Sequence, residues 1–146
     1  MNFKNSKQLI INNLKKEKSC FEDLIVKIGE QKKAIEDKDA ERVLEIIKEK
    51  NVLIEVFQNI EEEVAVQIKL LSKDDIQSLE KEGKPLKQSL EKLLETIVRM
   101  EDECEKDIGF KMREIEKRII GLQKGKKIGK GYGMALKSRP LISRKV

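Results

Sequence analysis

The stretch EDKDAERV, residues 36–43, decides how the chain folds, because it interrupts a long run of charged, helix-like sequence. Asp37 and Asp39 are unfavourable inside a helix but favourable at its start, where a carboxylate accepts hydrogen bonds from free backbone N–H groups. Glu41 follows in what would be the first turn of a new helix, where its charge complements the helix dipole. The stretch predicts a tight turn between two helices. The alternative is one helix that continues through Asp39.

Helical tracts are expected on both sides of this turn, at about residues 6–36 and 39–71. Their apolar residues recur mostly at steps of three, four or seven, which places them on one stripe of each helix. The two stripes are Ile10, Leu14, Phe21, Leu24, Ile25, Ile28 and Ile35, and then Ala40, Val43, Leu44, Ile47, Ile54, Phe57, Ile60, Val64, Ile68 and Leu71. Asn51 stands in the second stripe, where it could fix the register against a neighbouring helix or face solvent at the stripe's edge.

The next segment, SKDDIQSLEKEGKPLKQS at residues 72–89, predicts the end of the second helical tract and the start of further helices. Ser72 and Asp75 form a capping arrangement for a short helix at about residues 74–81. Gly83 and Pro85 interrupt the chain, and Pro85 suits the opening of the following helix. A third long tract is expected at about residues 86–122. Its stripe is Leu90, Leu93, Leu94, Ile97, Cys104, Ile108, Met112, Ile115, Ile119 and Leu122.

The composition agrees with long helices rather than with a sheet. Charged residues make up 40 % of the 146-residue chain and hydrophobic residues 38 %, whereas aromatic residues are only 3 %. Helices with one apolar stripe must pack side by side, and short turns make neighbours antiparallel. We therefore predict an all-α fold: an elongated antiparallel bundle of about three long helices with a short connecting helix, formed by residues 1–123.

Residues 124–146 are expected to form a flexible, basic, Gly-rich tail. From residue 121 onward the chain has eight Lys and Arg residues and no Asp or Glu, while its total net charge is +5, so the remainder carries −3. Glycines disfavour a helix in GKKIGKGYGMALKSRP, residues 125–140. The tail nevertheless contains several apolar residues. It is interpreted as a tether that folds on contact with a partner or with the chain's own groove.

The residues give no support to catalysis, a cofactor or a bound metal. The chain has no His, and nearly all of its Asp and Glu residues fall on charged helix faces. Cys20 and Cys104 have no metal-binding spacing and are expected to be reduced thiols on helix faces. The glycines of GKGYG lack the preceding strand and following helix of a nucleotide-binding loop. Without a signal sequence or a membrane-spanning run, the protein is expected to be cytoplasmic and not inserted in a membrane.

Protein binding is the function that remains, because a narrow bundle exposes grooves that accept another helix. The third tract has more apolar positions than one partner helix can cover. This predicts a groove near its C-terminal end, unless the first two tracts or a second copy of the chain covers it. The predicted partner-binding residues are Met112, Ile115, Ile119, Leu122, Tyr132, Met134 and Leu136.

The segment IGEQKKAIEDKDAERVLEIIKEKNVLIEVFQNIEEE, residues 28–63, resembles the first hairpin of the FlgN family of flagellar export chaperones. In that family a short acidic turn, here Asp39-Ala40, leads into a helix with a Lys between hydrophobic positions. The matching residues here are Leu44, Ile47, Lys48 and Lys50, followed by Leu53 and Ile54. The length, the third long helix and the Gly-rich end with a Tyr are similar too, whereas the basic, aliphatic ending KSRPLISRKV departs from the family pattern.

This resemblance implies a chaperone without catalytic residues or cofactors. Such a chaperone binds hook–filament junction proteins before type III secretion, masks their amphipathic helices and delivers them to an export-gate component. Three alternatives remain: a self-assembling structural coiled coil or adaptor, which includes a homodimer; a nucleic-acid-associated protein acting through the basic tail; and a related flagellar chaperone family. Nucleic-acid binding is disfavoured because the rest of the chain is acidic, and it would weaken steeply with salt.

Overall fold

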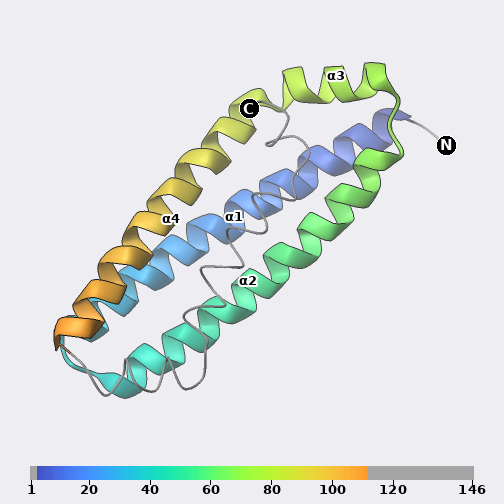
Figure 1. Ribbon diagram of the computed structural model, residues 1–146. Coiled ribbons are helices and arrows are strands. Elements are labelled where there is room, and N and C mark those ends of the chain that lie inside the picture. Colours follow the sequence, from blue (N-terminus) through green and yellow to red (C-terminus); the bar gives the residue numbers. More distant parts are fainter. Residues whose placement is uncertain (1–2, 112–146) are drawn as a thin grey trace.

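The computed structural model describes residues 3–111 and shows three long helices and one short helix in this part of the chain (Figure 1). The long helices are α1 (Phe3–Glu36), α2 (Ala40–Lys69) and α4 (Lys84–Lys111), and the short one is α3 (Lys73–Glu82). The prediction of an all-α bundle with a short connecting helix is confirmed. The proposed division at residue 123 and the basic tail lie outside the described residues.

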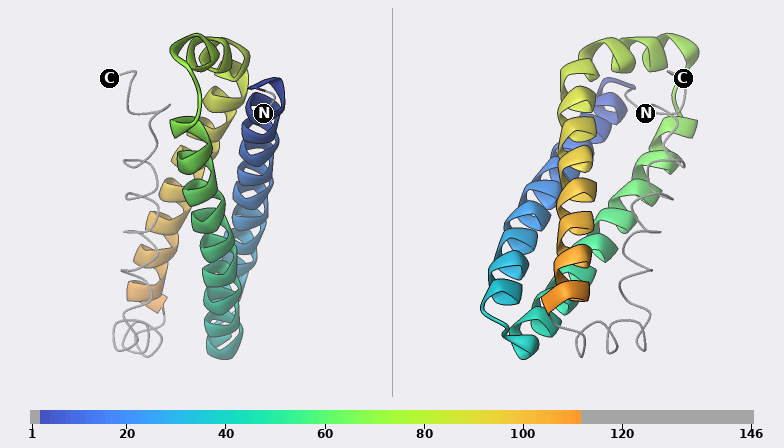
Figure 2. Two further views of the ribbon diagram at one scale, coloured as in Figure 1. Left: turned by 90° about the vertical axis from the view of Figure 1, so that its right-hand side faces the viewer. Right: turned by 60° about the vertical axis from the view of Figure 1, so that its left-hand side comes forward.

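In the pictures the three long helices run down, up and down along one elongated bundle (Figures 1 and 2). α1 and α2 are antiparallel, α3 crosses the end of the bundle, and α4 then runs back in the same direction as α1 (Figures 1 and 2). α1 packs along both α2 and α4, so it is the central helix of the described bundle. A narrow aliphatic core follows from this layout, because only α1 is flanked on two sides by long helices.

The turn between α1 and α2 forms where the sequence predicts it. Asp39 caps α2, and its carboxylate accepts a hydrogen bond from the backbone N–H of Arg42 at 3.1 Å. The N–H of Asp39 donates back to the carbonyl of Ala34 at 2.9 Å, which satisfies the end of α1. Lys38 between them has a φ of 57°, in the left-handed region. The alternative of one continuous helix through Asp39 is therefore wrong.

The links around α3 also follow the sequence. Ser72 caps α3, and its hydroxyl accepts a hydrogen bond from the N–H of Asp75 at 3.2 Å. At the other end the N–H of Gly83 donates to the carbonyl of Leu79 at 2.7 Å. A Cβ atom at position 83 would lie 2.9 Å from that same carbonyl oxygen, so glycine allows this close approach. Pro85 is the second residue of α4, where its missing N–H is not needed.

The core consists largely of the apolar stripes that the sequence predicts, although Ile46, which the α2 stripe left out, is fully buried and Leu44, which it included, is half-buried. The buried residues include Ile10, Leu14, Phe21, Leu24, Ile28 and Ile35 of α1, Val43, Ile47, Ile54, Phe57, Val64 and Ile68 of α2, and Leu90, Leu94, Ile97, Cys104 and Ile108 of α4. The rings of Phe21 and Phe57 meet at a centroid distance of 4.7 Å and fix the level of α1 against α2. α3 closes the end of the bundle with Leu79, and Lys7 of α1 holds it through Glu82 at 2.8 Å.

Lys38 gives a direct test of the hairpin geometry. A left-handed backbone costs a residue with a side chain about 1–2 kcal/mol, whereas glycine adopts it freely. Part of this gain is lost because glycine has more freedom in the unfolded chain. We expect Lys38→Gly to raise the free energy of unfolding in urea by about 0.5–1 kcal/mol. Lys48→Gly, at an exposed position inside α2, should lower it by about 1 kcal/mol. Equal destabilisation by both variants would contradict the assigned turn.

Candidate functional site: polar layers and exposed faces of the bundle

Each long helix presents a heptad seam to the core, with spacings that alternate between four and three residues. The α1 seam runs from Ile10 to Ile35, the α2 seam from Val43 to Ile68, and the α4 seam from Lys87 to Ile108. Two positions in each seam are polar: Glu17 and Gln31 in α1, Lys50 and Glu61 in α2, and Lys87 and Glu101 in α4. These six residues form two polar layers inside the aliphatic core.

The first layer, called the Lys50 layer, consists of Gln31, Lys50 and Glu101. Lys50 is only 1 % exposed, and its Nζ donates to Oε1 of Gln31 at 2.7 Å and to Oε1 of Glu101 at 2.5 Å. One ammonium group therefore links α2 to both α1 and α4. Because an unpaired buried charge is strongly unfavourable, this layer is satisfied only when all three helices are in their observed positions.

The second layer, called the Glu17 layer, consists of Glu17, Glu61 and Lys87. Glu17 and Glu61 each lie one helical turn from the contacting pair Phe21 and Phe57, so they face each other across the antiparallel hairpin. Lys87 precedes Glu101 by two heptads, just as Glu17 precedes Gln31. In the parallel pair of α1 and α4, this spacing brings Lys87 to the level of Glu17.

Burial governs the chemistry of the Glu17 layer. Glu17 is fully buried and Lys87 is 8 % exposed. Burial disfavours the charged form of a carboxyl and raises the pKa of Glu61 from 4.5 to about 8. The layer has two carboxyls and one ammonium, so retaining a proton on one carboxyl leaves it electrically neutral. One turn away, the amide of Asn13 donates to Oε1 of Gln67 at 3.1 Å and extends the polar contacts between α1 and α2.

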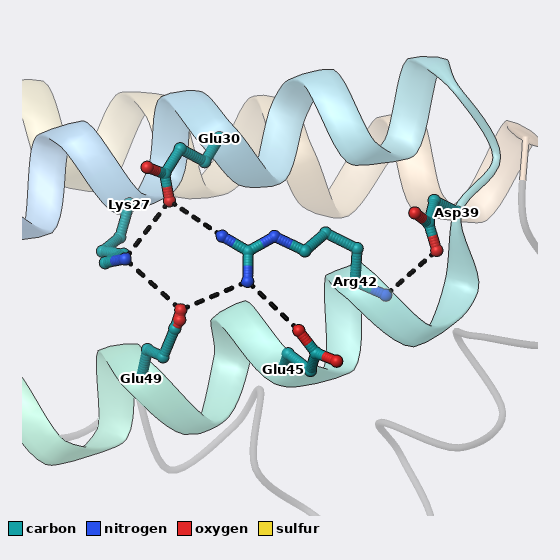
Figure 3. Close-up of polar contacts among 6 residues, drawn as sticks. All are labelled: Lys27, Glu30, Asp39, Arg42, Glu45 and Glu49. Atoms are coloured by element: carbon teal, nitrogen blue, oxygen red, sulfur yellow. Dashed lines mark hydrogen bonds and ion pairs between the residues drawn. The ribbon is translucent and has the colours of Figure 1, made fainter.

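A network of surface ion pairs joins α1 and α2 near the turn between them (Figure 3). Arg42 of α2 contacts Glu30 of α1 at 3.3 Å, and Lys27 of α1 contacts Glu49 of α2 at 3.3 Å. Glu45 adds a contact to Arg42 at 3.2 Å. These groups are partly exposed, so each pair contributes little on its own, and the network chiefly orients the two helices near the turn.

The two thiols are structural. Cys20 and Cys104 are free and buried, as expected, and burial raises the pKa of Cys20 and raises that of Cys104 to about 11. A thiol with a raised pKa is a poor nucleophile and a poor metal ligand. Among the described residues, no group of three or more His, Cys, Asp or Glu side chains could hold a metal ion. No helix within residues 3–111 is long and apolar enough to cross a membrane.

α2 carries a second heptad seam on the face opposite its core seam. Its members share the alternating spacing of four and three residues and are all exposed: Val52, Val56, Asn59, Glu63, Val66 and Leu70, the last of which is the C-cap residue that follows α2. The four apolar members are between 43 % and 61 % exposed. Among the described helices, α2 packs chiefly on α1, through the opposite face. We call this set of six residues the outer seam.

The residues predicted to bind a partner cannot be placed by this structure. Met112, Ile115, Ile119, Leu122, Tyr132, Met134 and Leu136 all lie outside the described residues. Within the described part, the stripe analysis singled out Asn51, which is half-buried, and missed its neighbour Lys50, which occupies the core position. The heptad spacing of α2 could have identified these positions from the sequence. Lys50 fills the gap in the seam between Ile47 and Ile54, and Glu61 fills the gap between Phe57 and Val64.

The comparison with protein families decides the identity of the chain. The family model described as "FlgN protein" matches residues 1–138, which include all four helices and most of the segment that follows them. The chain belongs to the FlgN family. No curated protein and no solved structure shows a significant similarity to it.

The FlgN match confirms the resemblance inferred from the first hairpin and makes this protein a flagellar export chaperone. The turn at Asp39 and the helix containing Lys50, which carried the resemblance, are the α1–α2 turn and α2 of the structure. In this FlgN protein, the lysine between hydrophobic positions is the centre of the Lys50 layer.

The Lys50 layer predicts two opposite effects of mutation. Glu101→Leu would leave the Lys50 ammonium buried without its carboxylate, and we expect a loss of about 3 kcal/mol in the free energy of unfolding. Replacing all three residues together, as Gln31→Leu, Lys50→Met and Glu101→Leu, should keep at least wild-type stability, because an apolar layer of similar volume needs no partner. Urea denaturation measures both variants, and an unaffected Glu101→Leu variant would contradict the layer.

The Glu17 layer predicts that the protein becomes more stable as the pH falls from 8 to 5. In this range the folded chain retains the Glu61 proton, whereas the unfolded chain, with a pKa near 4.5, releases it. The free energy of unfolding should therefore rise by up to about 1.4 kcal/mol per unit of decreasing pH. Glu61→Gln should flatten this dependence, and the exposed control Glu63→Gln should preserve it. Stability that increases with pH over the same range would refute the assignment.

Proposed function

We propose that this protein binds hook–filament junction proteins in the cytoplasm and delivers them to the flagellar export gate. The observation that carries the proposal is the family match, which extends to residue 138 and so includes the apolar residues from Met112 to Leu136. The fold and the family support an escort that acts by binding. Its cargo would be the amphipathic helices of junction proteins, whose apolar faces otherwise promote self-association.

The position of α4 supports a binding role for the residues that follow it. Glu103 contacts Lys32 at 3.7 Å, and the thiol of Cys104 lies 4.0 Å from the carbonyl oxygen of Ile28. These contacts put the last turns of α4 at the same level as the last turns of α1, which ends at Glu36. The C-terminal end of α4 therefore lies level with the C-terminal end of α1.

We assign cargo contact to the continuing stripe, Met112, Ile115, Ile119 and Leu122. An amphipathic helix of the cargo would lay its apolar face along these residues in the helix-in-groove mode. Tyr132, Met134 and Leu136 would add apolar anchors for the cargo or for the export gate, and the surrounding Lys and Arg residues keep this segment soluble until a partner arrives. Such burial is chiefly apolar, so the complex should survive moderate salt.

Co-expression of the full chain with a junction protein from the same organism tests the proposal. We expect a stoichiometric complex in size-exclusion chromatography that persists in moderate salt. Ile115→Asp combined with Ile119→Asp should weaken binding at least about 30-fold, because each charge would enter an apolar interface. The matched control is Val98→Asp, at an exposed position of α4, which should bind like the wild type.

Three results would contradict the proposal. Unchanged binding by the double variant would remove the assigned residues from the cargo contact. Dissociation in moderate salt would indicate electrostatic binding of the kind expected for nucleic acid. A stable assembly of the chain that never binds a junction protein would favour the structural coiled coil.

A further inference from the structure

The outer seam of α2 is an exposed, partly apolar surface to which the escort function assigns no role. Its six residues run along about 27 Å of helix, at 1.5 Å per residue, on the face of α2 that points away from α1. Heptad spacing is the pattern by which one helix packs against another over several turns. A solvated helix face needs no such order, whereas a docking face does.

The order of residues in the outer seam is symmetric. Reading from either end gives two apolar residues, then a polar pair, then two apolar residues. We propose that a second copy of this chain docks antiparallel on the outer seam, with a two-fold axis level with Glu61. This pairing forms three layers, each occurring twice: Val52 with Leu70, Val56 with Val66, and Asn59 with Glu63.

The polar layer selects the antiparallel orientation. Asn59 carries an amide donor and Glu63 a carboxylate acceptor, so each Asn59 donates to Glu63 of the second copy. In a parallel pair every residue meets its own equivalent, which places two Glu63 carboxylates in contact. Like charges at that distance repel, and the parallel pair is disfavoured.

Residues beside the seam complement each other in the same register. On one flank, Glu55 of one copy lies opposite Lys69 of the other, an ion pair that occurs twice. On the other flank, the half-buried Ile60 meets Ile60 of the second copy across the axis and adds apolar contact. Glu62 lies near its own equivalent, and this single like-charge repulsion is outweighed by the two Glu55–Lys69 attractions, so added salt should weaken the dimer slightly through these flanking charges.

Other occupants of the outer seam make different predictions. Residues 121–146 of the same chain are basic and could approach the four glutamates of residues 51–68, and a basic amphipathic helix of another protein could do the same. Neither explains the symmetric order or the Glu55–Lys69 match, which a second copy explains directly. With either of these occupants in place of a second copy, the purified chain would remain a monomer.

Light scattering of the purified full chain tests the dimer. We expect the mass to rise with concentration from 16.9 kDa to twice that value. Val56→Lys combined with Val66→Lys should raise the dissociation constant at least about 100-fold, because a two-fold interface contains each charge twice. Val26→Lys, at an exposed position of α1, should dimerise like the wild type.

The orientation is tested by cross-linking with a short bismaleimide. Glu62→Cys places a thiol beside its own equivalent at the axis, so this variant should cross-link to a covalent dimer. Glu55→Cys faces Lys69 in the antiparallel pair and should not, whereas a parallel pair would cross-link both variants. The native thiols at Cys20 and Cys104 are buried and do not compete.

Exchanging the charges of Glu55 and Lys69 tests the proposed ion pair independently. Glu55→Lys alone should weaken the dimer, and Glu55→Lys combined with Lys69→Glu should restore it. The proposal is overturned by a chain that stays monomeric at high concentration, by a dimer unaffected by the two lysine substitutions, or by cross-linking of Glu55→Cys as efficient as that of Glu62→Cys.

Discussion

The ion pair between Lys50 and Glu101, completed by Gln31, is the interaction on which the arrangement of the helices depends. An aliphatic seam of Leu, Ile and Val packs almost as well after a slip of one heptad, so apolar burial alone specifies the register weakly. Such a slip would place Lys50 level with Leu24 in place of Gln31 and would leave a buried ammonium without an acceptor on α1. Because that state is strongly unfavourable, the layer selects one register for three helices together.

The Glu17 layer applies the same constraint two heptads away. Two layers at different levels restrict both the sliding of α1 along its neighbours and the exchange of one neighbour for the other. This matters in a narrow bundle with few aromatic residues, since the large, shaped side chains that usually specify a core are scarce here. Phe21 and Phe57 form an aromatic contact between α1 and α2, and it lies next to the Glu17 layer.

Much of this fold could be predicted from the sequence because its signals are local. Asp39 and Ser72 indicate where α2 and α3 begin, and Gly83 allows the close approach of its backbone to the carbonyl of Leu79. Apolar residues that recur every three or four positions identify the buried stripe of each helix. The polar layers were harder to predict from the sequence, because a search for apolar stripes treats Lys50 and Glu61 as interruptions of the α2 stripe. Which partner satisfies a buried charge depends on contacts between helices far apart in the sequence, and Gln31, Lys50 and Glu101 are brought together only by the fold. The outer seam was not predicted from the sequence for a related reason. Its valines look like scattered surface residues until the core face of α2 is known.

In the proposed dimer, pairing and escort use different parts of the molecule. The core seam of α2 packs inside the bundle, and the outer seam faces away from α1 and α4. In an antiparallel dimer about Glu61, the hairpin turns of the two copies point in opposite directions. The ends of the two α4 helices, which lie level with those turns, are then also at opposite ends of the assembly. Cargo bound after Lys111 in one copy would not obstruct the other copy, so pairing through α2 and escort through the residues beyond α4 are compatible in one particle.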